Sequence, residues 1–572
     1  MRIFLAVYAR PPHRDAAQQA VLRAEKHLTS AFPVQAQRVN SSSWQAPHGG
    51  VHLLAWTNEP DWTLSTTPAG ATAVAGHHPG EPAHLDGAVA ARPGCFALFQ
   101  ADADGIGAAT SIAAADPVYY ARTGDLVVVG NRALLVRLAA YGEVEYDVLA
   151  LQSVARQGYF LSEETPFAGV RALPPASRLV ARDRLTVTTE PLPKGTGRGG
   201  GEVADHLVRA VEPLLHSSDE VRVTLTGGRD SRLIAALLTG AGIPYRAFTS
   251  GFDDDPDVIV ARRVAAALGV EHQVTPPPLT PDNELSVVHP ADRVHTVLRV
   301  CEGMLSAYEN ITGDAPYSTV PRLGGHNGEI LRGGFLSGMR ETTPQAVRHR
   351  TQTLFLAQRA LFTAEANAHA EQLAWTSDGL DVPDHLYVRF RVGRWHAAAR
   401  TAMLRRGTPV QPFLDNRVVA AALALDPAFR RSERLVHRLV KSFAPAAAKV
   451  PLEGGTWRFR AESAWARLRR RARGAEAAEA PAKPWNWRAE PGIEIAKELE
   501  ETIVSSAALG RIVDLDRVPA LFDGGRLVKP GVAWQLYTVA SLLGTDLTLP
   551  PPDARQRVLV QTKRRSATSQ GV

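Results

Sequence analysis

The segment from Val221 to Leu233 combines residue types that could bind a polyphosphate. It reads Val221-Arg222-Val223-Thr224-Leu225-Thr226-Gly227-Gly228-Arg229-Asp230-Ser231-Arg232-Leu233. The pattern predicts an apolar strand that runs into a loop of small residues and directly into a helix. Two glycines let backbone N–H groups turn inward without obstruction by Cβ, and the hydroxyl groups of Thr226 and Ser231 add donors. Because a helix N-terminus adds partial positive charge, the segment predicts an anion site suited to pyrophosphate.

Asp230 needs a further explanation, since a carboxylate repels phosphate. A cation between the two groups would remove the repulsion, and Mg²⁺ takes oxygen ligands from carboxylates and phosphates. Two common nucleotide motifs are absent, because the sequence has no G-x-x-x-x-G-K-[ST] string and no G-x-G-x-x-G after a strand. The alternative interpretation is that Thr226, Gly227 and Gly228 form an ordinary turn. The complete T-G-G-x-D-S string is far more specific than that turn.

Strands and helices alternate around this loop. Helix-spaced apolar residues predict a helix over 202–217. The following pattern predicts strands over 221–225, 245–249 and 272–274 and helices over 232–238 and 256–268. Such alternation is typical of βαβ units, so we predict an α/β fold with a doubly wound parallel sheet.

The flanking parts have a different character. Residues 1–190 are rich in predicted strands, including apolar runs at 96–99 and 126–129. The Gly/Pro-rich stretch 191–201 cannot pack as a regular element and is interpreted as a linker. The second predicted domain, 202–572, reads as mostly helical beyond Thr343 and contains a predicted mobile insertion at 474–484.

Composition excludes several classes of protein. With 45% hydrophobic and 21% charged residues among 572, the chain is globular rather than wholly disordered. A net charge of +6 is too small for this length to indicate nucleic-acid binding. No run approaches the ~20 apolar residues of a membrane-spanning helix. Cys95 and Cys301 are far apart in the sequence, which argues against a zinc site and fits a reducing, cytoplasmic setting.

The 226–231 string resembles the pyrophosphatase loop, S-G-G-x-D-S, of the asparagine synthetase family and related N-type ATP pyrophosphatases. Residues 325–335 are similar to the family's G-E-G-x-D-E-L-F-G-G-Y, and residues 412–418 resemble its V-P-F-L-D segment. The resemblance spans, with gaps, roughly residues 202–460, and it implies ATP as the nucleotide. It implies that Mg²⁺ is held by Asp230 and by Glu329, which stands where the family has an aspartate. The nucleotide-binding residues that it implies are Leu225, Thr226, Gly227, Gly228, Arg229, Asp230, Ser231, Thr249, Ser250 and Gly325.

Residues 1–190 resemble the class II glutaminase domain of the same family, through the segments 94–98, 116–120 and 126–135. This resemblance implies an Ntn-hydrolase-like α+β sandwich. The family's nucleophile is a cysteine directly after the initiator methionine, but this position is Arg2, which cannot supply a thiolate. Cys95 lies in an apolar strand, where a buried thiol is expected. We therefore predict that this domain does not hydrolyse glutamine.

Three cationic residues are candidates for charge neutralisation. Arg229 stands where the family often has an apolar residue; it would bind the α-phosphate or a substrate carboxylate, or else point to solvent. Lys449 lies near the position of the family's catalytic lysine, shifted by about one helical turn. Arg458 is the alternative source of that charge.

Three further residues have both a chemical and a structural interpretation. Glu302 and Glu309 would share a face of a helix predicted over 297–310, and either could act as a general base. An ordinary solvated or ion-paired face is the alternative. His326 could contact the substrate or support the loop that carries Glu329.

These features predict an ATP-dependent carbon–nitrogen ligase. A substrate carboxylate would attack the α-phosphorus to give an acyl-adenylate and pyrophosphate, and an amine would then form the amide and release AMP. The predicted catalytic residues are Asp230, Glu329, Lys449 and Arg458.

The substrates and partners stay open. The acid is a small molecule or a peptide, and the amine is ammonia or part of the substrate itself, as in the similar lasso-peptide cyclases and β-lactam synthetases. A precursor peptide and a second copy of the chain are the candidate partners, and no nucleic-acid or membrane partner is expected. A non-catalytic adenine-nucleotide binding protein is the alternative from another class.

Overall fold

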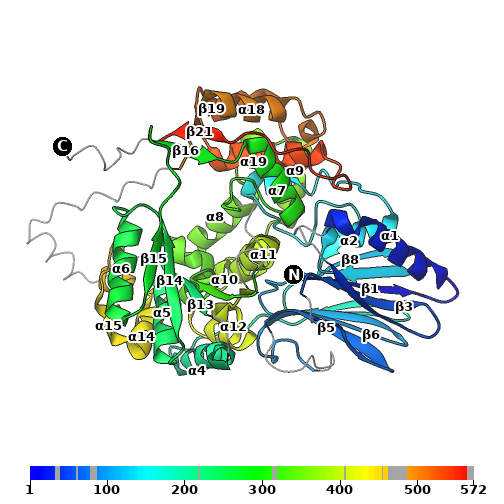
Figure 1. The fold of residues 1–572 in the computed structure, drawn as a ribbon, viewed down its shortest axis with the longest axis horizontal. Helices are drawn as coiled ribbons and strands as arrows, with labels where there is room; N and C mark the ends of the chain where they lie inside the picture. The colour runs from blue at the N-terminus through cyan, green and yellow to red at the C-terminus, as the bar shows by residue number, and fades with distance from the viewer. Residues whose placement is uncertain are drawn as a thin grey trace, which may run out of the picture.

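The computed structural model describes residues 1–31, 39–59, 62–77, 87–216, 220–311, 318–404, 408–453, 455–461 and 486–562. Figure 1 shows two antiparallel sheets (blue) beside a parallel sheet (green), with the C-terminal helices α18 and α19 (orange to red) above them. The insertion predicted at 474–484 lies outside the described residues.

Two six-stranded antiparallel sheets form the first part of the chain, in the orders β10-β8-β9-β1-β3-β2 and β12-β11-β7-β6-β5-β4. Their strands are β1 (Arg2–Ala9), β2 (Asn40–Gln45), β3 (Val51–Thr57), β4 (Ser65–Thr67), β5 (Gly70–His77), β6 (Cys95–Asp102), β7 (Gly105–Thr110), β8 (Tyr119–Thr123), β9 (Leu126–Gly130), β10 (Val170–Ala172), β11 (Ser177–Ala181) and β12 (Leu185–Thr189). The helices of this part are α1 (Asp15–Ala31), α2 (Ala133–Tyr141) and α3 (Gln152–Gln157).

Strand β1 is apolar without interruption from Ile3 to Ala9 because both of its faces are buried. Its even-numbered residues from Phe4 to Tyr8 lie in the core between the two sheets. Its odd-numbered residues from Ile3 to Val7 lie in a second core, together with residues of α1 and α2. Because successive side chains of a strand point to opposite faces, a strand buried on both faces needs apolar residues throughout. This layering confirms the predicted α+β sandwich.

A five-stranded parallel sheet follows, in the order β15-β14-β13-β17-β18. Its strands are β13 (Val221–Thr224), β14 (Tyr245–Ser250), β15 (His272–Thr275), β17 (Pro321–Gly324) and β18 (Thr408–Pro409). Helices α5 (Arg229–Gly240) and α6 (Pro256–Leu268) connect β13, β14 and β15. The strand order reverses between β13 and β17, which confirms the doubly wound prediction. Loops that follow these two strands therefore border the crevice where such sheets bind ligands.

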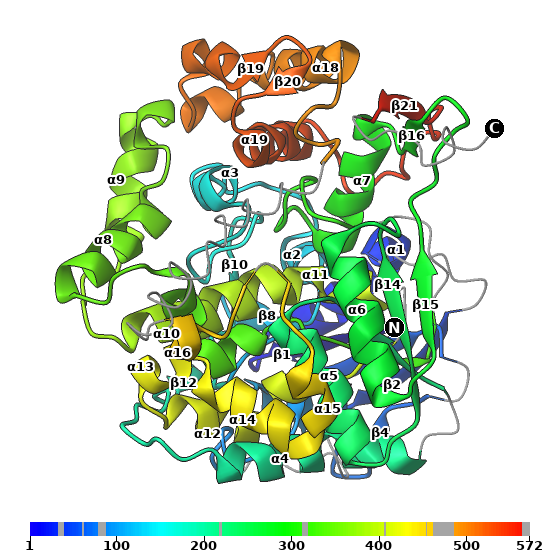
Figure 2. The same cartoon turned by 90° about the vertical axis from the view of Figure 1, so that its left-hand side faces the viewer.

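The remaining helices pack around the parallel sheet and on the sandwich (Figure 2). They are α4 (Gly201–Val211), α7 (Pro290–Cys301), α8 (Pro344–Phe355), α9 (Ala364–Leu373), α10 (Val382–Leu386), α11 (Ala397–Leu404), α12 (Asn416–Leu423), α13 (Pro427–Arg431), α14 (Arg434–Phe443), α15 (Pro445–Lys449), α16 (Arg458–Ala461), α18 (Ile493–Val504) and α19 (Pro530–Leu543). Two short strand pairs join β16 (Glu284–Val287) to β21 (Val558–Gln561) and β19 (Phe522–Asp523) to β20 (Arg526–Leu527). None of the helices in the described ranges would suffice, in length and apolar character, to span a bilayer.

The prediction of a helix over 297–310 is wrong beyond Cys301, where α7 ends. Glu302 ends α7 in the left-handed conformation, with φ of 53°. Its buried carboxylate accepts hydrogen bonds from the N–H groups of Ala133 (3.1 Å) and Leu134 (2.8 Å) at the start of α2. The Nε of Arg132 lies 3.5 Å from it. Glu302 therefore caps a helix of the sandwich and shares no helix face with Glu309.

Residues 412–418, which resemble V-P-F-L-D, join the sandwich to the second part of the chain. The carboxylate of Asp415 accepts a hydrogen bond from the Gly94 N–H (2.9 Å). The side-chain oxygen of Asn416 accepts one from the Ile112 N–H (2.7 Å). Nearby, Arg400 of α11 and Asp116 form a buried ion pair at 2.8 Å. These contacts hold the two parts of the chain against each other. They also pair polar groups that burial would otherwise leave without hydrogen-bond partners.

Candidate functional site

A cavity of about 400 Å³ lies where the strand order of the parallel sheet reverses. One wall is the 226–231 loop with the first turn of α5, and a second wall is the loop after β17, which carries His326, Glu329 and Arg332. The third wall is a π-helix, Tyr387–His396. A concave site with convergent polar groups at this position is the place where an open α/β sheet is expected to bind its ligand.

Side chains of the protein hold the 226–231 loop in shape. The Oγ of Ser231 accepts a hydrogen bond from the Thr226 N–H (3.0 Å) and lies 2.9 Å from the Thr226 Oγ1. The Gly228 N–H donates to Thr226 Oγ1 (3.2 Å), and the Gly227 N–H donates to the carboxylate of Asp257. These N–H groups have protein acceptors, contrary to the expectation that they turn toward a ligand. The anion-binding capacity of the loop therefore rests on the N-terminus of α5, which has no side-chain cap, and on the two hydroxyl groups.

Two glycines bring the loop after β17 close to α5. A Cβ on Gly325 would lie 2.4 Å from the backbone nitrogen of Ser231, and a Cβ on Gly328 would lie 2.4 Å from the Cγ of Asp230. Side chains at these positions would push the two loops apart. The small residues therefore allow the two loops to approach closely, with Asp230 and Glu329 in the lining of one cavity.

The two carboxylates converge on a guanidinium. Arg332 Nε lies 3.0 Å from Asp230 Oδ1, and Arg332 Nη2 lies 2.5 Å from Asp230 Oδ2. The same Nη2 lies 3.6 Å from Glu329 Oε1, while Glu329 Oε2 accepts a hydrogen bond from the Tyr387 hydroxyl (2.9 Å). Burial acts against the charge on Arg332, yet the pairing with Asp230 raises the pKa of Arg332 above its usual value.

The residues present suit Mg²⁺ in chemistry but not in arrangement. Asp230 and Glu329 offer the oxygen donors that Mg²⁺ prefers. However, each carboxylate oxygen of Asp230 already accepts a charged hydrogen bond from Arg332, so a metal ion at Asp230 would lie close to a guanidinium that repels it. Within the described part of the chain, no group of three or more His, Cys, Asp or Glu residues could hold a metal. The metal roles of Asp230 and Glu329 stay predictions, which this arrangement does not favour.

Comparison with known proteins points to the same part of the chain. Residues 202–288 match the sequence model of the asparagine synthase family. The matched segment contains β13, the 226–231 loop and Asp257, but it ends before Glu329 and Arg332. No curated protein matches the chain in sequence.

Two solved structures resemble the chain weakly. The allosteric regulatory enzyme of purine biosynthesis has 9% identity and a TM-score of 0.22, and the match covers 48% of this chain and 65% of that enzyme. Glutamine phosphoribosylpyrophosphate amidotransferase from B. subtilis, solved with ADP and GMP, has 9% identity and a TM-score of 0.21, with 57% and 75% covered. The chain thus spans just under two thirds of the length of the first enzyme.

Several residues that the asparagine synthetase resemblance implied lie outside the cavity. Leu225 is buried in the core, and its carbonyl accepts a hydrogen bond from the Thr249 hydroxyl (2.6 Å). Thr249 also lies 2.8 Å from the Nε2 of His272, so its hydroxyl joins β13, β14 and β15. Ser250 is exposed at the end of β14, and Gly227 packs beneath the side chain of Glu453. These four residues do not line the cavity, whereas Gly325 does.

The predicted cations have other surroundings. Lys449 is exposed at the end of α15, outside the cavity lining. Arg458 also lies outside it and donates from Nη2 to the Ser337 carbonyl (2.5 Å). Arg229 lines the cavity, but its Nε pairs with Glu433 at 2.8 Å. Its Nη2 also donates to the Thr456 carbonyl (3.2 Å), so the side chain does not point freely to solvent, and its binding of a phosphate or carboxylate stays a prediction.

Sequence reasoning missed the cavity residues Arg332, Tyr387, Arg391 and Trp395. Arg332 lies within the 325–335 string, and its spacing of three residues from Glu329 was the available signal. The other three line the cavity from the π-helix, where the Arg391 guanidinium lies 3.5 Å from the centre of the Trp395 ring. Such helices are rare and occur often at functional sites. No sequence periodicity distinguishes this one from an ordinary helix.

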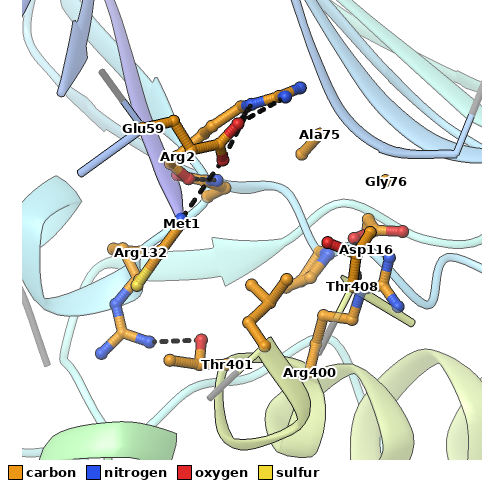
Figure 3. A pocket seen from close by; sticks show the side chains of 13 residues that line it. Met1, Arg2, Glu59, Ala75, Gly76, Asp116, Arg132, Arg400, Thr401 and Thr408 are labelled. Carbon is orange, nitrogen blue, oxygen red and sulfur yellow. Dashed lines mark hydrogen bonds and ion pairs between the residues drawn. The ribbon is translucent and has the colours of Figure 1, made fainter. Parts of the chain in front are cut away.

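A second cavity, of about 120 Å³, lies beside the first residues of the sandwich and α11 (Figure 3). Its wall includes the ion pair between Arg2 Nη2 and Glu59 Oε2, at 2.7 Å. Cys95 is outside this lining and is buried, and burial raises the pKa of its thiol to about 12. No thiolate nucleophile is therefore placed among the residues that line this cavity.

Proposed function

We propose that the protein is an ATP-dependent ligase that activates a substrate carboxylate as an acyl-adenylate and transfers the acyl group to an amine. The observation that carries this proposal is the position of the 226–231 loop. It borders the cavity at the reversal of the strand order, with the N-terminus of α5 beside it, in the segment that matches the asparagine synthase family.

The first step needs positioning and charge neutralisation more than covalent help. An oxygen of the substrate carboxylate attacks the α-phosphorus, the bond between the α-phosphorus and the bridging oxygen breaks, and pyrophosphate leaves. The α5 N-terminus and the hydroxyl groups of Thr226 and Ser231 bind the phosphates. The guanidinium of Arg332 offsets the negative charge of the two carboxylates beside them.

In the second step the amine nitrogen attacks the acyl carbon, and the bond from that carbon to the AMP oxygen breaks. The nitrogen loses a proton, and Glu329 is the carboxylate that can accept it. Glu329 lines the cavity with 38% of its side chain exposed. The Tyr387 hydroxyl holds its other oxygen in place.

The amine does not come from glutamine hydrolysis in this proposal. Arg2 stands at the nucleophile position and is paired with Glu59, and the Cys95 thiol is buried. The amine is then ammonia from solution or an amine of the substrate itself. In the second case the product is a ring, either a lactam or a macrolactam of a peptide.

The test is product analysis with full-length protein, ATP, Mg²⁺ and a panel of acids, amines and unprotected peptides. The proposal expects AMP and pyrophosphate in equal amounts, with no stimulation by glutamine. Ser231→Ala should lower turnover about 10- to 100-fold through loss of a phosphate donor and of the loop contacts. Ser505→Ala, at an exposed serine after α18, is the matched control. Formation of ADP and phosphate, or full turnover by Ser231→Ala, would contradict the proposal.

A further inference from the structure

Arg332 is held rigidly in the cavity wall. It ends the 3-10 helix Gly328–Arg332, and its side chain is only 15% exposed. The backbone of this helix is anchored by Arg430, whose Nη1 donates to the Ile330 carbonyl (2.7 Å) and which is itself paired with buried Asp384. The position of Arg332 between Asp230 and Glu329 is therefore built into the fold.

One edge of the Arg332 guanidinium is free to meet a ligand. Nε and Nη2 are used by Asp230. Among the residues that the structure describes, Nη1 has no hydrogen-bond partner, and Arg332 lines the cavity. A guanidinium has five N–H donors in a planar fork, so it can bind a carboxylate with one edge and a phosphate oxygen with another.

The two carboxylates in the cavity lining need a cation such as the Arg332 guanidinium beside them if a polyphosphate is to bind there. Asp230 and Glu329 would repel a polyphosphate if nothing compensated them. The cavity has two other arginines in its lining: Arg229 is paired with Glu433, and the guanidinium of Arg391 lies over the Trp395 ring. Arg332 is thus the cation that lies against both carboxylates.

We infer that Arg332 takes the place that a metal ion would have at Asp230. One edge of its guanidinium neutralises Asp230, and Nη1 donates to the phosphates of a nucleoside polyphosphate. Asp230 is then a positioning residue that acts through Arg332. This inference rests on the proposed function, because it takes the phosphates to bind in this cavity. A divalent cation that arrives with the nucleotide is held by the phosphates and not by Asp230.

The first measurement is the affinity for ATP by calorimetry, in excess EDTA and in excess Mg²⁺. The unmodified protein should bind ATP in EDTA within about threefold of its affinity in Mg²⁺. Arg332→Met should weaken binding about 10- to 100-fold in EDTA, the loss expected for a hydrogen bond between charged groups. Arg517→Met is the matched control, because Arg517 pairs with Asp514 at the same three-residue spacing on the surface. A loss of more than tenfold on adding EDTA to the unmodified protein would overturn the inference.

The second measurement does not depend on whether Arg332→Met folds. Asp230→Asn keeps the shape of the side chain, and Mn²⁺ binding to the complex with ATP is followed by electron paramagnetic resonance. The inference expects Mn²⁺ affinity to change by less than threefold, and a tenfold loss would overturn it by making Asp230 a metal ligand. A failure of ATP to bind in either buffer would overturn the proposed function as well. Binding that needs a metal at Asp230 would overturn this inference alone.

Discussion

Replacement of Asp384 by alanine removes one half of a buried ion pair behind the loop that carries Glu329 and Arg332. The side chains of Asp384 and Arg430 are 2% and 1% exposed. Arg430 donates from Nη1 to Asp384 Oδ1 and from Nη2 to Asp384 Oδ2. Arg430 also holds the carbonyl of Ile330, one residue after Glu329. Loss of the carboxylate leaves a buried, unpaired guanidinium at the point where the loop after β17 is fixed.

The expected cost follows from that burial. Breaking a buried pair by removing one partner costs about 3–5 kcal/mol, whereas an exposed pair contributes about 0–1 kcal/mol. Asp378→Ala is the control, because the pair of Asp378 with Arg348 has side chains that are 40% and 58% exposed. Since total stability is about 5–15 kcal/mol, Asp384→Ala should lower the melting temperature by several degrees and Asp378→Ala by little.

The assay combines thermal unfolding by circular dichroism with ATP titration. Asp384→Ala should weaken ATP binding as well, because the Glu329 and Arg332 loop loses its anchor. The double variant Asp384→Leu/Arg430→Met should recover most of the stability, since a well-packed apolar pair can replace a buried ion pair. An unchanged melting temperature and an unchanged ATP affinity for Asp384→Ala would refute the reasoning.

Three further predictions concern Glu453, Gly328 and Cys95. Burial and a neighbouring carboxyl group raise the pKa of Glu453 from 4.5 to about 7. The folded state then binds more protons than the unfolded state in that window, so stability falls as the pH rises from 4.5 to about 7. Glu453→Gln should remove this dependence, which melting temperatures at pH 5 and pH 8 would show; an unchanged pH dependence would contradict the shift. Gly328→Ala places a Cβ 2.4 Å from the Asp230 Cγ and should weaken ATP binding at least tenfold, while Gly199→Ala, with nothing within 4 Å, should leave calorimetric affinity unchanged. The buried Cys95 thiol should react with Ellman's reagent at pH 8 only after unfolding, and rapid labelling of the native protein would be inconsistent with its burial.

Local rules predicted the elements around the loop because local signals determine them. Helix α6 begins and ends at the predicted residues, with Pro256 in its first turn and Gly269 in the left-handed conformation after its end. The strand, loop and helix from Val221 to Gly240 were likewise visible in the alternation of apolar and small residues. The resemblance to the asparagine synthetase family, and not local rules, predicted that Asp230 and Glu329 share one site, and the structure has both in the lining of one cavity.

Contacts between distant residues decided the rest. Glu302 ends α7 because its carboxylate caps a helix that begins 169 positions earlier, at Ala133. Arg332 binds Asp230 from 102 positions away, and Arg229 pairs with Glu433 across 204 positions. No local pattern reports such pairs, so the chemistry of the loop could be predicted while its counter-ions could not.

The most direct test of the central claim is a crystal structure of the protein with α,β-methylene-ATP, which cannot be cleaved at the bond that adenylation breaks. The account predicts the triphosphate at the N-terminus of α5, against the hydroxyl groups of Thr226 and Ser231, with a phosphate oxygen on Arg332 Nη1. A nucleotide seated in the cavity beside Arg2 and Glu59, or no nucleotide at saturating concentration, would contradict it.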